Sequence, residues 1–163
     1  MLRNIESETK PIPLTVIVAD KHPIARAALA SLLTYDGYRV FQADSLAAAV
    51  SYINYNENLS VLIADLEMPD WRSIVRHAVR TTHALLIGME GNHPISEMYD
   101  LHEHGLRLCL QKPINYNDVR GAIEKNVLHP RTAKREYARG FGSAVIIEGT
   151  PSVLIDCNHF PID

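Results

Sequence analysis

The sequence has few of the features that mark secreted, membrane-spanning or nucleic-acid-binding proteins. Its only two cysteines, Cys109 and Cys157, form neither a C-x-x-C pair nor a zinc-binding pattern. It has no run of about 18 apolar residues, as a membrane-spanning helix would need, and no apolar signal segment near Met1. The formal net charge of −3 argues against unaided binding to nucleic acid. We therefore expect a cytoplasmic protein with two free thiols.

The composition predicts a packed core. Hydrophobic residues make up 47% of the 163 residues and charged residues 21%, which is typical of a globular chain. This length suits one domain of ordinary size with a short extension. We divide the chain into an N-terminal tail (1–13), a main domain (14–128) and a C-terminal extension (129–163).

Apolar and helical segments alternate through the main domain. Five short runs are apolar at nearly every position, which is typical of strands buried on both faces of a parallel sheet: 14–19, 38–41, 60–64, 84–88 and 106–110. Segments with helical spacing follow them at 23–35, 45–50, 74–80, 94–104 and 116–127. The alternation predicts an α/β fold with right-handed crossovers. Five such units fit the flavodoxin-like, doubly wound sheet with strand order 2-1-3-4-5.

The C-terminal extension differs in composition from the main domain. His129-Pro130 ends the last helix, and residues 131–139 are basic. Apolar runs at 143–148 and 152–157 flank a turn signal, which predicts a short β-hairpin. A lone hairpin is only marginally stable in water, so it must pack against the main domain, another copy of the chain or further sequence. Because strand edges pair readily, we expect a homodimer to which this extension contributes.

Charged residues follow three of the predicted strands. Asp20 and Lys21 follow the first strand, Asp65 ends the third, and Lys112 follows the fifth. In open α/β sheets, ligands bind at the carboxyl ends of the strands. We therefore expect the functional site where these four side chains meet.

Residues 14–128 resemble a bacterial response-regulator receiver domain. Asp65 matches the phosphorylated aspartate of that family, residues 68–70 match its Met-Pro-Asp turn, and Lys112 with Pro113 matches its lysine and proline. The resemblance implies that Asp65 is the phosphoacceptor, that Lys112 steadies the phosphoryl oxygens, and that the Lys112–Pro113 bond is cis. It also implies that Asp20, Asp65 and the backbone carbonyl of Glu67 hold Mg²⁺.

Several positions depart from the family pattern. The second acid after the first strand, the hydroxyl after the fourth strand, the aromatic residue on the fifth strand and the Asp-Gly after the turn are all replaced. The residues present instead are Lys21, Gly88 (or Met89 if the loop shifts), Cys109 and Arg72-Ser73. His22, beside the acidic position, is predicted to pack at the rim of the pocket.

Lys21 is the most consequential departure. An alternative register pairs Ala19 with Asp20, but the spacing to Pro23 and Arg26 favours Lys21 at the second acidic position. A typical receiver pocket carries three carboxylates and one lysine, whereas Asp20, Asp65, Lys21 and Lys112 sum to zero. Mg²⁺ would then lose a ligand and electrostatic attraction. Two hypotheses remain: the Lys21 ammonium pairs with Asp65 in place of the metal, or it points into solvent.

The extension carries a second, shorter resemblance. Arg135-x-x-x-Arg139, followed by two predicted strands, looks like the start of a PilZ domain over about 25 residues. That resemblance implies that Arg135 and Arg139 bind the phosphates and guanines of cyclic di-GMP, to which guanidinium groups are suited. The D/N-x-S-x-x-G element of that family is absent. The alternative is a basic linker and hairpin used for packing or dimerisation.

Together these patterns predict a non-enzymatic signalling module of the two-component type. The leading hypothesis is a pseudo-receiver that acts by protein–protein contact, without a cofactor or metal-dependent phosphorylation. Its partner would be a histidine kinase or a downstream signalling protein. One alternative is a working receiver phosphorylated on Asp65 with Mg²⁺; another is a cyclic di-GMP-linked fragment. The chain after Leu128 is too short for a helix-turn-helix domain, so direct nucleic-acid binding is not expected.

Overall fold

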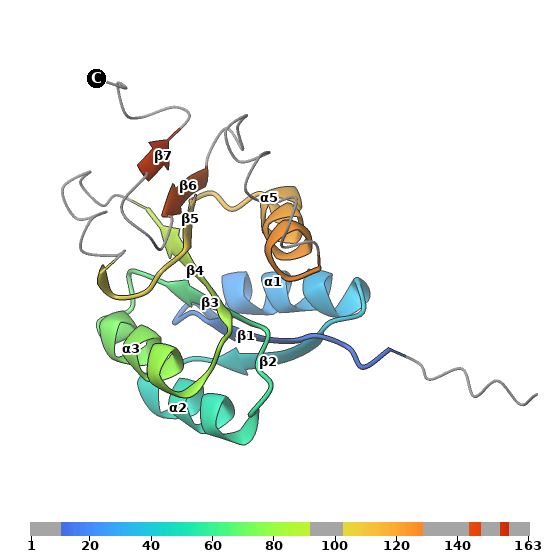
Figure 1. Cartoon of the computed structure of the whole chain (residues 1–163), viewed down its shortest axis with the longest axis vertical. Coiled ribbons are helices and arrows are strands. Elements are labelled where there is room, and N and C mark those ends of the chain that lie inside the picture. Colours follow the sequence, from blue (N-terminus) through green and yellow to red (C-terminus); the bar gives the residue numbers. More distant parts are fainter. Residues whose placement is uncertain (1–10, 92–102, 129–143, 148–153, 157–163) are drawn as a thin grey trace, which may run out of the picture.

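The sheet has the predicted parallel core. A computed structural model describes residues 11–91 and 103–128 and the backbone of two further strands at 144–147 and 154–156. Its first five strands are β1 (Thr15–Ala19), β2 (Arg39–Ala43), β3 (Val61–Asp65), β4 (Leu85–Glu90) and β5 (Leu108–Gln111). They pair in parallel in the order β2-β1-β3-β4-β5, which confirms the flavodoxin-like arrangement (Figure 1).

Four helices connect the described strands. They are α1 (Pro23–Tyr35), α2 (Leu46–Tyr55), α3 (Trp71–Thr81) and α5 (Tyr116–Ile123), and α5 continues as a π-helix, η1 (Glu124–Leu128). Helix α3 starts three residues before the predicted Ile74, because Trp71 is already buried in the core. The helix predicted at 94–104 lies almost wholly outside the described residues. No helix in the described segments is long and apolar enough to cross a membrane.

Local sequence signals explain where these helices begin and end. The Ser45 hydroxyl accepts a hydrogen bond from the Ala48 N–H, and the Asn115 side chain caps α5 through the Asn117 N–H. Pro23 occupies the first turn of α1, where its missing N–H costs nothing. Gly37 follows α1 with φ of 94°, a left-handed conformation that favours glycine.

The sheet separates two apolar cores. Because side chains alternate along a strand, Ile17 and Leu62 face α2 and α3, whereas Val16 and Ile63 face α1 and α5. Figure 1 shows α2 and α3 on one side of the sheet and α1 and α5 on the other. Every residue of β3 is buried, as predicted for a strand covered on both faces.

The C-terminal hairpin extends the same sheet. Strand β6 (Ala144–Ile147) pairs antiparallel with β5, and β7 (Leu154–Asp156) pairs antiparallel with β6. These strands lie within the predicted ranges 143–148 and 152–157. We expected a second copy of the chain to cover the apolar faces of this hairpin. In the structure, β6 pairs with β5, the edge strand of the main domain. Arg135 and Arg139 lie outside the described residues.

The cap of α2 gives a direct test of the local rules. Replacing Ser45→Ala removes the hydroxyl that satisfies the Ala48 N–H, and we expect a loss of about 1 kcal/mol in the free energy of unfolding. Urea unfolding followed by circular dichroism measures it. Ser51→Ala, in the exposed middle of the same helix, is the control and should change stability by less than about 0.5 kcal/mol. Equal losses in the two variants would contradict the capping role.

Candidate functional site

The predicted site residues meet at the carboxyl edge of the sheet. Asp20 follows β1, Asp65 is the last residue of β3, and Lys112 follows β5. Asp20 and Asp65 are buried, with 3% and 0% of their surface exposed. The topology brings these residues together because β1, β3 and β5 run in the same direction and end at one edge.

Lys112 is the cation that pairs with Asp65. Its Nζ lies 2.7 Å from Asp65 Oδ1 and 3.1 Å from Glu67 Oε2. Burial by itself lowers the pKa of Lys112, but the hydrogen bonds that its ammonium donates to Asp65 and Glu67 outweigh this effect and raise the pKa above its usual value. The Lys112–Pro113 bond is cis, as predicted.

Lys21 does not pair with Asp65. Its side chain is exposed, and its Nζ donates a hydrogen bond to the backbone carbonyl of Glu67, at 3.4 Å. The sequence offered two hypotheses for Lys21, an ion pair with Asp65 or a side chain that points into solvent. Neither describes this contact fully, because the ammonium does not bind Asp65 but still hydrogen-bonds a backbone carbonyl of the pocket. Lys21 instead contacts the carbonyl that the family resemblance assigns to the metal ion.

His22 contributes a contact that sequence reasoning did not anticipate. Its backbone N–H donates to Asp20 Oδ1 at 2.8 Å, and its Nδ1 lies 3.3 Å from the same oxygen and 3.8 Å from Asp65 Oδ2. The Arg26 Nη1 donates to the Asp20 carbonyl at 2.7 Å and so fixes the backbone there. The His22 side chain is 54% exposed at the rim of the pocket, and its ring nitrogen also faces both carboxylates.

The Glu67 side chain also belongs to the pocket. Sequence analysis considered only its backbone carbonyl, but Oε2 accepts a hydrogen bond from Lys112. Glu67 therefore adds a third carboxylate to Asp20 and Asp65, against the two ammonium groups of Lys21 and Lys112. The pocket carries a formal charge of −1 with neutral histidine, rather than the zero counted from the sequence.

The end of β4 lies two residues beyond the predicted end of that strand. Met89 pairs with Asp65 in the register, and the strand continues through Glu90, which is buried. The residue at the carboxyl end of β4 is therefore Glu90 rather than Gly88 or Met89, and none of the three carries a hydroxyl. Burial raises the pKa of the Cys109 thiol, and the Glu90 carboxylate raises it further. A carboxylate thus lies near the β5 position where the resemblance implies an aromatic ring.

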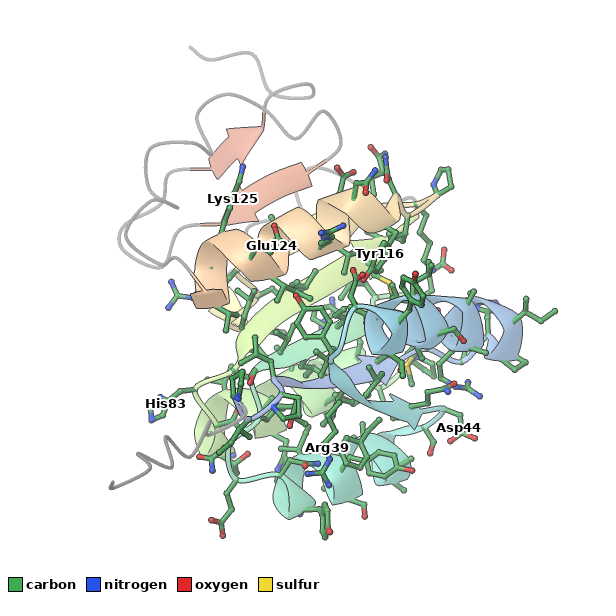
Figure 2. All side chains as sticks on the ribbon, turned by 90° about the vertical axis from the view of Figure 1, so that its right-hand side faces the viewer. Arg39, Asp44, His83, Tyr116, Glu124 and Lys125 are labelled. Carbon is green, nitrogen blue, oxygen red and sulfur yellow. The ribbon has the colours of Figure 1, made fainter. Side chains whose placement is uncertain are left out.

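An apolar groove opens beside the charged residues. Its volume is about 490 Å³, and α1 and the β5–α5 connection form its walls. The charged end is lined by Asp20, His22, Glu67 and Lys112, and the rest by Ala25, Ala28, Leu29, Leu32, Met89, Pro113, Ile114 and Tyr116. Figure 2 shows Tyr116 on α5 near α1, where its hydroxyl donates a hydrogen bond to the Leu32 carbonyl or to Asp36.

The residues present fit the family's Mg²⁺ only in part. Asp20 and Asp65 are in place, but Lys21 supplies no carboxylate and its ammonium hydrogen-bonds the Glu67 carbonyl. A hard cation that takes oxygen ligands loses two of them in this arrangement. The ligand atoms of Asp20, His22 and Asp65, in contrast, all lie within 4.8 Å of one another.

Comparison with known proteins was made on sequence and on structure. A model of the "Response regulator receiver domain" family matches residues 16–124, which is more than half of the chain. No curated protein matches the sequence.

Solved receiver structures share the fold. A receiver domain protein from Clostridium thermocellum is 23% identical, with a TM-score of 0.65, over 73% of this chain and 98% of its own. A CheY-like receiver domain from Methanospirillum hungatei is 16% identical, with a TM-score of 0.67, over 74% of this chain and 98% of its own. A response regulator from Burkholderia pseudomallei, solved with a phosphorylated aspartic acid and a calcium ion, is 19% identical, with a TM-score of 0.64, over 75% and 73% of the two chains. This chain belongs to the response regulator receiver domain family, whose members act in two-component signalling.

Proposed function

We propose that this receiver domain is a pseudo-receiver, which signals by protein–protein contact without Mg²⁺-dependent phosphorylation. The observation that carries the proposal is the hydrogen bond of 3.4 Å from Lys21 Nζ to the Glu67 carbonyl. The Lys21 ammonium hydrogen-bonds the Glu67 carbonyl, which is one of the three oxygen ligands that the family resemblance implies for the metal. A bound dication there would also face its positive charge, and like charges repel strongly at short range.

The carboxyl ends of β4 and β5 support the same proposal. Receivers of the family's pattern stabilise the phosphoryl group with a hydroxyl after β4 and respond through an aromatic residue on β5. Residues 88–91 contain no hydroxyl that could hydrogen-bond a phosphoryl group. Cys109 is buried on β5 and is too small to replace a moving aromatic ring.

Contact surfaces remain available without phosphoryl chemistry. Helix α1 exposes Ile24, Leu32 and Tyr35, with 84%, 44% and 89% of their surfaces accessible. Leu32 also lines the groove described above, and an exposed apolar patch is typical of an interaction site. A histidine kinase or a downstream signalling protein in the cytoplasm is the partner we propose.

The test of this function is exposure of the full chain to Mg²⁺ and a small-molecule phosphoryl donor. Intact-mass spectrometry should show no phosphoryl adduct on the unaltered protein. An adduct that forms with Mg²⁺ and disappears in Asp65→Asn would overturn the proposal.

Restoring the missing acid should restore cation binding. In Lys21→Asp the ammonium leaves the Glu67 carbonyl and a carboxylate takes its place, so we expect Mg²⁺ to bind at least about tenfold more tightly, or roughly 1.4 kcal/mol. Isothermal titration calorimetry measures the affinity, and fluorescence of Trp71, the single tryptophan, gives a second signal. Lys125→Asp changes the net charge equally on η1 and is the matched control. Equal gains in both variants would show a non-specific charge effect.

A working receiver is the second candidate. It is favoured by the contact between Lys112 Nζ and Asp65 Oδ1 at 2.7 Å, because this pair is the family's arrangement for stabilising an acyl phosphate. In this case the phosphorylation experiment above would label Asp65 and the label would depend on Lys112. Lys112→Met should then lower labelling by at least about tenfold, since a neutral side chain cannot stabilise the developing charge.

We further propose that the chain forms a homodimer to which the extension contributes. Strand β7 is the last strand of the sheet, so within the described residues one of its edges has no neighbouring strand. Free strand edges pair readily with a second copy. Cyclic di-GMP binding by Arg135 and Arg139 is not proposed, since no described contact favours it.

Removal of residues 129–163 tests the role of the extension. The remaining chain contains the whole family match and should fold and sediment as a monomer, whereas the full chain should sediment as a dimer. Sedimentation velocity at several protein concentrations separates the two states. A dimeric truncated chain would place the interface on the main domain instead.

A further inference from the structure

One buried carboxylate oxygen in the pocket has no hydrogen-bond donor. Asp65 Oδ1 accepts from Lys112 Nζ at 2.7 Å and from the Glu67 N–H at 3.0 Å. No donor among the described residues reaches Asp65 Oδ2, although the residue is fully buried. A buried, unsatisfied carboxylate oxygen costs free energy and requires an explanation, such as an ion that binds there.

A ring nitrogen of His22 lies close to that oxygen. Its Nδ1 lies 3.8 Å from Asp65 Oδ2, too far for a hydrogen bond, and 3.3 Å from Asp20 Oδ1. The His22 side chain is 54% exposed, so an ion can reach the ring from solvent. Two carboxylates and one imidazole therefore converge on one point at the mouth of the pocket.

The spacing of these atoms suits a small tetrahedral ion. Metal–ligand distances of about 2.0–2.1 Å place neighbouring ligand atoms about 3.3 Å apart in a tetrahedron. The distances of 3.3 and 3.8 Å from the His22 nitrogen are close to that value, and all three ligand atoms lie within 4.8 Å of one another, so the two carboxylates must move closer together around a bound ion. Binding through Asp65 Oδ2 also preserves the Lys112 contact on Oδ1, and it does not use the Glu67 carbonyl that Lys21 occupies.

We propose that Asp20, His22 and Asp65 form a binding site for a borderline divalent transition-metal ion of the Zn²⁺ class, which makes this module responsive to such a metal. Imidazole nitrogen favours ions of this class, whereas Mg²⁺ favours oxygen ligands in an octahedron. The pocket charge of −1 attracts the ion, and water completes its coordination. The inference rests on the function proposed above, because the same pocket cannot also hold the family's Mg²⁺ and phosphoryl group.

The test uses Zn²⁺ alone with the metal-free full chain. Calorimetry should show one Zn²⁺ site with a dissociation constant in the micromolar range. Mg²⁺ in large excess should not displace the Zn²⁺. His22→Gln should weaken binding at least about tenfold, because it removes the nitrogen ligand. The variant should fold normally, because the His22 side chain makes no capping bond to α1. Circular dichroism checks this.

His83→Gln is the matched control. His83 precedes β4 and so lies at the amino end of the strands, and Figure 2 shows it far from Asp44, which follows the carboxyl end of β2. Zn²⁺ affinity in this variant should equal that of the unaltered chain. Equal affinity in His22→Gln, or no binding by the unaltered chain at millimolar Zn²⁺, would overturn the proposal. Neither result affects the pseudo-receiver function, which fails only if Mg²⁺-dependent phosphorylation of Asp65 is found.

Discussion

The site depends on how the buried charge of Asp65 is neutralised. An ionised carboxylate with no exposed surface is costly unless it is paired and hydrogen-bonded. The Lys112 ammonium and the Glu67 N–H both meet one oxygen of this carboxylate, and the other oxygen faces Asp20 and His22. The shared carboxyl edge of β1, β3 and β5 brings these groups together.

In the function proposed above, the Lys21 ammonium is what separates this chain from a metal-dependent receiver. The contact between Lys21 and the Glu67 carbonyl takes an oxygen ligand from a hard cation. The imidazole of His22 offers a nitrogen beside the same carboxylates, which suits a softer ion. On this proposal, a lysine at the second acidic position changes both the charge of the pocket and the class of ion that the remaining ligands favour. Helix α1 lines the apolar part of the groove that begins at this charged end.

The fold could be predicted well from the sequence, because the five apolar runs and the helical spacing between them are local signals. The pairing of Asp65 with Lys112 followed from the family resemblance. The roles of His22 and Glu67 could not be predicted, because side-chain direction at the ends of strands depends on packing between distant segments. The end of β4 was predicted too early for a similar reason: Gly88 resembles a strand terminator, but pairing with β3 and β5 carries the strand to Glu90.

The central claim is that the Glu67 carbonyl is held by an ammonium and does not receive Mg²⁺. Backbone NMR of the full chain, titrated with Mg²⁺ and a beryllofluoride mimic of the acyl phosphate, tests it most directly. The account predicts that the amide resonances of Glu67 and Lys112 keep their positions at millimolar Mg²⁺. Large, saturable shifts of both resonances, absent in Asp65→Asn, would contradict it and show that the pocket has retained the chemistry of a working receiver.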